Sequence, residues 1–426
     1  MDISVYILLL LLGLLACGTP VAISVGVSSF AYLLATRVTI EALPQRMFAT
    51  VDTSTLFAVP LFLLAGFLMN SAGITDRIFK FARTLVGHIT GGLAHVNVIA
   101  SMIFASMSGS SVADAAGLGS IEIKAMREAG YAPDFACAVT LASCTISPII
   151  PPSIILVIYG VAAEISIGRL FMAGILPGIV MAGLLMGVNI VLAKRHNYPT
   201  DPRASFKALY SAFFRAALPL GTPVIILGGI MGGIFTATEA AAVAVLYTLA
   251  LDLFVYRELT FRKLKKILLE VGTTSAAILF LVSVTGIFSW VLAREQVPIH
   301  VMEFFLSITT NPIFILLVIN LVLLVLGTFL DATPIVLLMV PVLMPLLRMI
   351  EYDLVAFGIV IAINTMIGLT TPPVGVSLYA VSAVGGVPVH RVIPKLLPYW
   401  FALVASLLLV TYVPDIALFI PRLLFR

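Results

Sequence analysis

Long apolar runs separated by short polar segments fill the chain from its N-terminal end onward. Segments such as 5–17, 175–193 and 401–413 contain no charged residue. A membrane-spanning helix needs about 20 mostly apolar residues, and no segment shows the short alternation of polarity that is typical of a β-barrel strand. The pattern therefore predicts an all-α polytopic membrane protein with about ten or more hydrophobic spans.

Charged residues predict which loops between these spans face the cytoplasm. Basic side chains concentrate in segments 194–215 and 257–266, and short loops rich in Lys and Arg stay on the cytoplasmic side. Counting from the first of these loops predicts a periplasmic N-terminus, two spans within 217–256, and further spans near 3–17, 20–36, 55–72, 168–192, 271–293 and 395–414. We expect amphipathic arms along the membrane surface at 75–88, 202–215, 259–270 and 297–309.

Composition agrees with a lipid environment and excludes several classes of function. The chain is 61% hydrophobic and 10% charged, whereas soluble domains carry about 25% charged residues. Its net charge of +4 arises mainly in the short basic loops, without the recognition pattern of a nucleic-acid interface. The chain has no nucleotide-binding P-loop, so an ion gradient is the expected energy source for moving a solute.

An internal repeat is the most informative feature of the sequence. Pro151-Pro152 recurs as Pro372-Pro373, and the same offset places Ser143 on Asn364. Upstream, the Gly-to-Asp segments 109–114 and 327–331 recur in the same order. We predict two halves that each contain a re-entrant helical hairpin (91–129 and 311–350) and a broken transmembrane helix (133–163 and 354–385).

Charge indicates that the two halves are inverted. The first hairpin is flanked by the basic residues Lys80, Arg83, Lys124 and Arg127. The flanks of the second hairpin carry mainly acidic residues, namely Glu295, Glu303, Glu351 and Asp353. Because basic flanks face the cytoplasm, the first hairpin is expected to enter from inside and the second from outside.

Four polar clusters interrupt the apolar sequence of the two halves. The hairpin clusters are SMSGSSVAD at 106–114 and GTFLDATP at 327–334. The broken-helix clusters are SCTISPIIPPS at 143–153 and NTMIGLTTPP at 364–373, where proline removes backbone donors and frees carbonyl oxygens. Such oxygens suit Na⁺, and helix N-termini suit a carboxylate substrate. Small-residue packing and simple kinks are the alternatives, whereas Glu239 in TATE at 236–239 fits a helix cap better than an intramembrane acid.

These halves give a division into five parts. The parts are N-terminal scaffold spans (1–72), a first transport half (73–164), scaffold spans with amphipathic arms (165–293), a second transport half (294–390) and a C-terminal span (391–426).

The motifs together resemble the large membrane subunit, the DctM-type permease, of tripartite ATP-independent periplasmic (TRAP) transporters. The resemblance covers nearly the whole chain and rests on SGSSVAD at 108–114, SPIIPPS at 147–153, GGIFTATEAAAVA at 232–244, GTFLDATP at 327–334 and TTPPVG at 370–375. It implies a multi-pass permease of the bacterial inner membrane, not an enzyme, with elevator-type, ion-transporter-like architecture. The implied co-transported ion is Na⁺, without an organic cofactor.

The resemblance also implies where ligands bind. The implied sodium-binding residues are Ser108, Ser110, Asp114, Ser143, Gly327, Asp331, Asn364, Thr370 and Thr371. The candidate substrate-binding residues at the same clusters are Ser110, Ser147, Pro151, Pro152, Asn364 and Pro372.

The implied function is Na⁺-coupled import of an organic acid, of the C4-dicarboxylate or sialic acid type, by elevator alternating access. The implied partners are a small Q-type membrane subunit and a periplasmic substrate-binding protein, beside membrane lipid and no nucleic acid. The alternative is a binding-protein-independent Na⁺/carboxylate symporter of similar architecture. A channel is disfavoured because the polar residues form separate clusters instead of a continuous lining.

Overall fold

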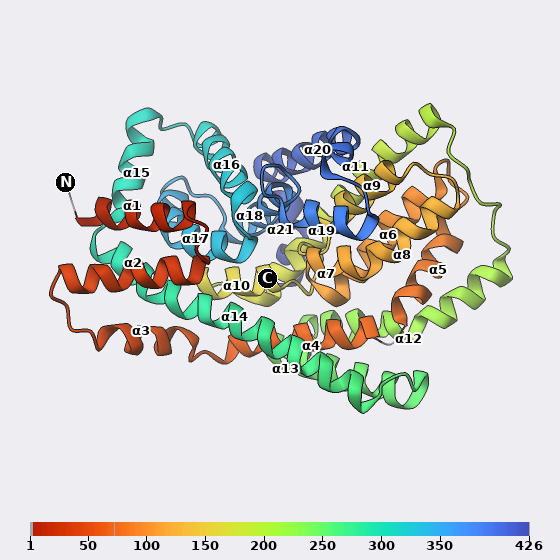
Figure 1. Cartoon of the computed structure of the whole chain (residues 1–426), viewed down its shortest axis with the longest axis horizontal. Helices are drawn as coiled ribbons and strands as arrows, with labels where there is room; N and C mark the ends of the chain where they lie inside the picture. Colours follow the sequence, from red (N-terminus) through yellow and green to blue (C-terminus); the bar gives the residue numbers. More distant parts are fainter. Residues whose placement is uncertain (1–2, 72, 426) are drawn as a thin grey trace.

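The computed structural model describes residues 3–71 and 73–425, and these residues form an all-helical molecule (Figure 1). Within those ranges it describes the backbone alone of residues 4, 71, 108, 112 and 113. The predicted all-α fold class is confirmed. Both predicted hairpins and both predicted broken helices are present, and each lies within a few residues of its expected bounds.

The first repeat contains a hairpin, a broken helix and a long closing helix. Its hairpin runs through α6 (Gly92–Ser108), the short α7 (Ser111–Ala116) and α8 (Leu118–Glu128). The broken helix consists of α9 (Pro133–Cys144) and α10 (Ile154–Ala163), and α11 (Ile167–His196) follows. The second repeat has the same order, with α16 (Pro312–Phe329), α17 (Ala332–Met349), α18 (Leu354–Leu369), α19 (Val376–Gly385) and α20 (Val389–Tyr412).

The two repeats pack against each other reciprocally. The second half of each broken helix contacts the hairpin of the other repeat, so that α10 packs on α17 and α19 packs on α7. In the same way α20 packs on α9 and α11 packs on α18. Figure 1 shows the two hairpins entering from opposite ends, with α6 and α8 on the right and α16 and α17 on the left. This exchange of contacts is the arrangement expected of two inverted repeats around a shared centre.

The first halves of the broken helices form that centre. Every residue from Phe135 to Cys144 in α9 and from Val355 to Leu369 in α18 is buried. A helix that is apolar all round is stable only where other helices cover it on every side. Both helices then stop at their proline clusters, and the prolines Pro152 and Pro373 each follow a cis peptide bond.

The remaining helices form a scaffold around the repeats. α14 (Phe261–Arg294) crosses much of the molecule in Figure 1 and contacts α2 (Val21–Ala35), α3 (Ala42–Val51) and α4 (Ala58–Ser71). α4 in turn packs on α13 (Ala237–Ala250) and reaches the first hairpin at α6. The other elements of this group are α1 (Ile3–Ala16), the 3₁₀ helix Ser54–Phe57, α12 (Phe206–Met231), the π-helix Leu251–Tyr256 and α15 (Val297–Ile308).

The structure corrects two of the predicted arms. Segments 202–215 and 259–270 are not separate surface helices, because α12 and α14 begin near the start of these segments and continue into the following spans for 26 and 34 residues. Two helices, α3 and α21 (Asp415–Leu424), were not expected. The arms at 75–88 and 297–309 do form separate helices, α5 (Ile74–Val86) and α15. Thr236 and Glu239 form the predicted capping box of α13.

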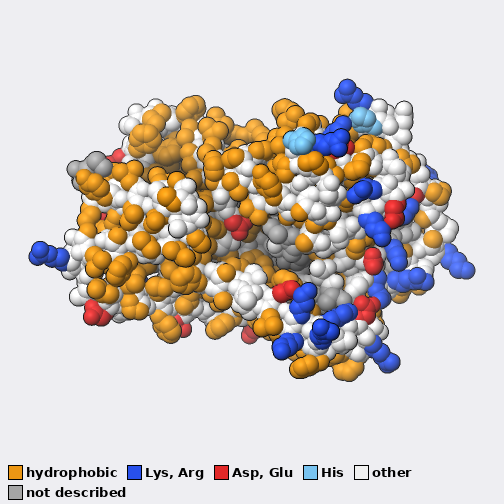
Figure 2. All heavy atoms as spheres, viewed as in Figure 1, with side chains coloured by type: hydrophobic (Ala, Val, Ile, Leu, Met, Phe, Trp, Pro, Cys, Tyr) orange, Lys and Arg blue, Asp and Glu red, His pale blue; other side chains and the backbone are white. Residues whose placement is uncertain are grey.

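The lengths and apolar composition of the helices fit a polytopic membrane protein. Among the described residues, seven helices, with α13 and the π-helix that continues it counted as one, have at least 18 residues and enough apolar sequence to cross a membrane. The number is eight if α3 and α4, bent by 62°, count as one span. α1, α2 and the halves of the broken helices are shorter apolar helices, and the prediction of ten or more spans had included them. In Figure 2 hydrophobic side chains cover most of the visible face, while Lys and Arg gather at the right-hand end.

Candidate functional site

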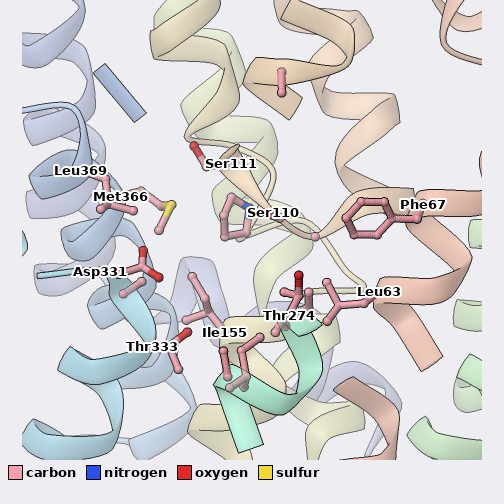
Figure 3. Close-up of a pocket in the computed structure, with 18 of the residues that line it drawn as sticks. Leu63, Phe67, Ser110, Ser111, Ile155, Thr274, Asp331, Thr333, Met366 and Leu369 are labelled. Atoms are coloured by element: carbon pink, nitrogen blue, oxygen red, sulfur yellow. The ribbon is translucent and has the colours of Figure 1, made fainter. Parts of the chain in front are cut away.

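A cavity of about 610 Å³ lies where the two hairpin tips approach each other (Figure 3). Its wall comes from both repeats and from two scaffold helices, α4 and α14. Figure 2 shows the centre of this face hollowed. The residues that line the cavity are Leu63, Gly66, Phe67, Asn70, Phe104, Gly109, Ser110, Ser111, Ala116, Pro148, Ile154, Ile155, Thr274, Ala277, Ile278, Leu281, Asp331, Ala332, Thr333, Pro334, Met366 and Leu369.

The lining is mainly apolar and carries few polar groups. Ser110 and Ser111 lie at the first tip, Asp331 and Thr333 at the second, and Thr274 comes from α14. Among the residues that the structure describes, no Lys, Arg or His belongs to this lining. Apolar walls with a small number of placed polar groups are typical of a site for a small molecule.

Helix N-termini supply positive potential where basic side chains are missing from the lining. α10 begins at Ile154 and α17 begins at Ala332, and both residues line the cavity. The unpaired amide groups of a helix N-terminus favour an anion. Two such ends at one cavity fit a carboxylate group.

Behind the first tip, a network of buried side chains joins α6 to α9. Asn97 Nδ2 donates to Thr140 Oγ1 over 2.7 Å, and Ser143 Oγ donates to Asn97 Oδ1 over 2.5 Å. Ser101 Oγ donates to Ser143 Oγ over 3.1 Å. All four side chains are fully buried. The hydroxyl of Ser143, predicted as a sodium ligand, also reaches a second acceptor, the backbone oxygen of Thr140 at 2.9 Å.

Asp114 lies in the interior of the first repeat instead of the cavity wall. It is fully buried and accepts a hydrogen bond from Ser147 Oγ, which is also buried. The two residues connect the hairpin to the break in the first broken helix. Predicted separately as a sodium ligand and a substrate contact, they are direct partners in this structure.

The first hairpin tip packs directly on the proline break. Gly109 has a φ of +59°, and a Cβ atom there would lie 2.7 Å from the carbonyl oxygen of Pro152. Glycine is required at this position by both the backbone conformation and the close approach. Pro151 and Pro152 are consequently buried beneath the tip, while the neighbouring Pro148 lines the cavity.

A second network joins α16, α18 and α20 behind the other tip. Asn364 Nδ2 donates to the backbone oxygen of Asn320 over 3.0 Å and to Asn320 Oδ1 over 2.9 Å. Asn320 Nδ2 donates to Thr411 Oγ1 over 3.1 Å. Asn364 is fully buried, yet its Oδ1 atom has no hydrogen-bond partner among the described residues. An unpaired buried amide oxygen is costly, and it is explained if it binds a ligand such as a cation.

The second tip also contacts its break through backbone atoms. A Cβ atom on Gly368 would lie 2.5 Å from the Cα atom of Gly327. The backbone oxygen of Thr328 accepts from Val374 N and Gly375 N, each over 3.3 Å. The tip and the break are therefore held as one unit.

The threonines at the second break are engaged with neighbouring groups. Thr370 Oγ1 donates to the oxygen of Ile367 over 2.8 Å and accepts from Trp400 Nε1 over 3.0 Å. Thr371 Oγ1 donates to the same oxygen over 2.7 Å. Pro372, next to them, is partly exposed and lies outside the cavity lining.

The predicted site residues thus fall into two groups. Ser110 and Asp331 line the cavity, and the others lie at the tips and breaks behind it. The side chain of Ser108 falls outside the described residues. The predictions missed the asparagines Asn97 and Asn320, because the offsets of 217 and 221 place Asn97 on Phe314 and Val318, and only the contacts with Ser143 and Asn364 show that the two asparagines correspond. They also gave no role to Glu122, whose buried carboxylate oxygens have no hydrogen-bond partner among the described residues.

Comparison with known proteins assigns the family. The family described as "Tripartite ATP-independent periplasmic transporter, DctM component" matches residues 8–416. The chain belongs to this family. It is 48% identical over 413 residues to the sialic acid TRAP transporter large permease protein SiaM of Vibrio cholerae, covering 97% of both chains. It is 38% identical over 400 residues to the C4-dicarboxylate TRAP transporter large permease protein DctM of Pseudomonas aeruginosa, covering 94% of both.

A solved structure supports the architecture of this DctM-family chain. The YdaH transporter of Alcanivorax borkumensis aligns with a TM-score of 0.60 over 88% of this chain and 89% of the other, at 14% sequence identity. At that identity the likeness concerns the fold alone. The chain is thus an integral membrane TRAP large permease, and the permeases that it resembles are transporters instead of enzymes.

Proposed function

We propose that this permease imports an organic acid together with Na⁺ by an elevator mechanism. The observation that carries the proposal is the cavity between two oppositely entering hairpin tips, closed on one side by scaffold helices α4 and α14. A substrate held there contacts both repeats at once. Movement of the repeats as a unit past the scaffold would then expose the cavity first to one side of the membrane and then to the other.

The chemistry of the cavity supports an anionic substrate with a cation. Two helix N-termini face the cavity and favour a carboxylate, but Asp331 adds negative charge, and no described residue of the wall has a basic side chain. A cation bound nearby would offset this charge. The candidate ligands are hydroxyl, amide and carbonyl oxygens, which suit a hard ion such as Na⁺. The unpaired Oδ1 of Asn364 is the most specific of them.

The relatives support a substrate class for the proposal. SiaM is named for sialic acid and DctM for C4-dicarboxylates. Both are acids whose carboxylates fit the two helix N-termini. We assign this chain to the same class and favour sialic acid, because the identity to SiaM is higher, at 48% against 38%.

The proposed assembly has three components. A small membrane subunit would cover part of the exposed apolar scaffold, and a periplasmic binding protein would deliver the acid to the cavity. Support comes from the tripartite family to which the chain belongs. A binding-protein-independent symporter with the same permease fold is the second candidate.

Uptake into proteoliposomes tests the proposal. The permease with its small subunit would be supplied with labelled sialic acid or succinate, with and without an inward Na⁺ gradient and a binding protein. Uptake that needs both additions supports the tripartite Na⁺-coupled function. Uptake with Na⁺ alone identifies the second candidate, and uptake that is equal with and without the Na⁺ gradient contradicts coupling.

A further inference from the structure

Asn97 and Asn320 hold matching places in the two repeats. Asn97 lies on α6, the first helix of its hairpin, and Asn320 lies on α16, the first helix of the other hairpin. Each contacts a residue on the first half of its broken helix, Ser143 on α9 or Asn364 on α18. The repeat itself pairs those two contacted residues, because the offset that aligns Pro151-Pro152 with Pro372-Pro373 also aligns them.

Both asparagines accept hydrogens from the residue that they contact. Asn97 Oδ1 is the nearer of two acceptors for the hydroxyl hydrogen of Ser143, at 2.5 Å against 2.9 Å for the backbone oxygen of Thr140, and Asn320 accepts amide hydrogens of Asn364 through its side-chain and backbone oxygens. A cation binds only to lone pairs, so a ligand side chain must direct its hydrogens elsewhere. When the asparagine accepts those hydrogens, the lone pairs of Ser143 Oγ and the Oδ1 atom of Asn364 are directed away from it.

A further bond fixes the orientation of each asparagine. Asn97 Nδ2 donates to Thr140 Oγ1, so its Oδ1 is directed toward Ser143. Asn320 Nδ2 donates to Thr411 Oγ1, whose own hydrogen goes to the oxygen of Leu407 over 2.8 Å. Each side chain in this series therefore donates a hydrogen to the next group, from Asn364 to Asn320, from Asn320 to Thr411 and from Thr411 to the backbone of α20. Reversing the amide of Asn364 would place its oxygen against the backbone oxygen of Asn320.

We propose that Asn97 with Thr140, and Asn320 with Thr411, are positioning residues that orient Ser143 and Asn364 as ligands of the transported cation. The inference deepens the proposed function and rests on it. Its strongest support is the fully buried Oδ1 of Asn364, which has no hydrogen-bond partner among the described residues. In this arrangement the cation would bind Oδ1 of Asn364, which lies at one end of the series of hydrogen bonds that joins α18, α16 and α20.

The test uses near-isosteric substitutions at Thr411 in the permease complex. Thr411→Val removes the acceptor for Asn320 and allows the amides to reorient, while Thr411→Ser retains the hydroxyl. We expect Thr411→Val to raise the half-saturating Na⁺ concentration about tenfold, as for loss of one buried hydrogen bond, and Thr411→Ser to remain within about twofold of the native protein. The readouts are Na⁺-dependent uptake and the Na⁺-dependent rise in thermal unfolding temperature.

A matched control separates positioning from general stability. Ser406 is another buried hydroxyl on α20 and donates to the oxygen of Leu403 in its own helix. Ser406→Ala should lower stability slightly without changing the half-saturating Na⁺ concentration. Equal Na⁺ responses of Thr411→Val and Ser406→Ala would overturn the proposal, as would equal losses in Thr411→Val and Thr411→Ser.

The first repeat offers the same test independently. Thr140→Val and Thr140→Ser make the corresponding comparison at Asn97, so the proposal stays testable even if one valine variant does not fold. A native complex that lacks any Na⁺ response would refute the proposed function. A native Na⁺ response that neither valine variant alters would refute the positioning roles alone.

Discussion

The two repeats share their topology but differ in how their polar groups are satisfied. In the first repeat, Ser143 donates to Asn97 and also accepts from Ser101, so part of the capacity of its oxygen is used. In the second repeat, Asn364 donates to Asn320 and its oxygen has no partner among the described residues. The comparison teaches that both repeats keep the same packing of a hairpin on a broken helix. They differ in whether the oxygen that could bind a ligand already accepts a hydrogen bond.

The largest effect is expected where a tip meets its break. Gly368→Ala would place a Cβ atom 2.5 Å from the Cα atom of Gly327, and backbone at that distance must move. We expect destabilisation of about 1–3 kcal/mol and transport below about a tenth of native, since the tip also bounds the cavity. Thermal unfolding and uptake would be measured together.

A glycine elsewhere provides the control for that substitution. Gly183 lies in the middle of α11, and beyond its own helix backbone no atom of the described residues lies within 4 Å of the position that a Cβ atom would take. Gly183→Ala should leave transport intact and stabilise the helix by roughly 0.5–1 kcal/mol. Full transport by Gly368→Ala would show that the tip does not need to rest on the break.

The two acids of the repeats should separate function from stability. Asp331 faces the cavity, whereas Asp114 is buried and accepts a bond from Ser147. Asp331→Asn is expected to raise the half-saturating Na⁺ concentration about tenfold through loss of one charge, with little change in unfolding temperature. Asp114→Ala leaves the Ser147 hydroxyl without its acceptor and should cost about 1–3 kcal/mol of stability.

Na⁺ titration of uptake and thermal unfolding of both variants would check this separation. Asp331→Glu, which retains the charge, is the matched control at the cavity. An Asp331→Asn variant with native Na⁺ dependence would remove Asp331 from the proposed cation site.

The ligand side chains of the two networks should respond unequally. Asn364→Ala removes an oxygen that has no partner among the described residues, whereas Ser143→Ala removes one that already accepts from Ser101. We expect the half-saturating Na⁺ concentration to rise about tenfold for Asn364→Ala and about threefold for Ser143→Ala. Equal shifts, measured by Na⁺-dependent uptake, would show that the two repeats contribute alike.

The hairpins and the broken helices could be predicted from the sequence because proline, glycine and charged residues affect the backbone or the membrane topology at their own positions. The paired prolines Pro151 and Pro152 remove neighbouring backbone donors and so favour a break, unlike the single Pro177 inside α11, and the basic flanks of the first hairpin predict its side of the membrane. The polar partners could not be derived in this way. The pairing of Asn97 with Ser143 depends on how α6 packs on α9, and the link from Asn320 to Thr411 joins α16 to α20.

The same limit explains the errors in the arms. The amphipathic starts of α12 and α14 resemble surface helices in the sequence, but Gly272, which could mark a boundary after 259–270, lies inside α14 and does not interrupt it. Helix hydrogen bonding therefore continues through the change in polarity. The cavity itself was inaccessible to sequence reasoning, because Leu63, Thr274 and Asp331 meet only in three dimensions.

The smallest effect is expected at Glu122, a further difference between the repeats. Glu122 on α8 is fully buried, and neither of its carboxylate oxygens has a hydrogen-bond partner among the described residues. The second repeat has an apolar residue at the aligned position. This residue is Met339 at the offset that aligns the Gly-to-Asp segments, or Leu343 at the offset that aligns the proline pairs. An ionised carboxylate in such surroundings is costly, so the neutral acid is the favoured form. Glu122→Gln has the same shape as that acid, and transport and unfolding temperature should stay close to native. Strongly reduced uptake by a folded Glu122→Gln variant would instead mean that this carboxylate takes part in ion coupling, and that the first repeat compensates for its more fully bonded Ser143 with an acid that the second repeat lacks.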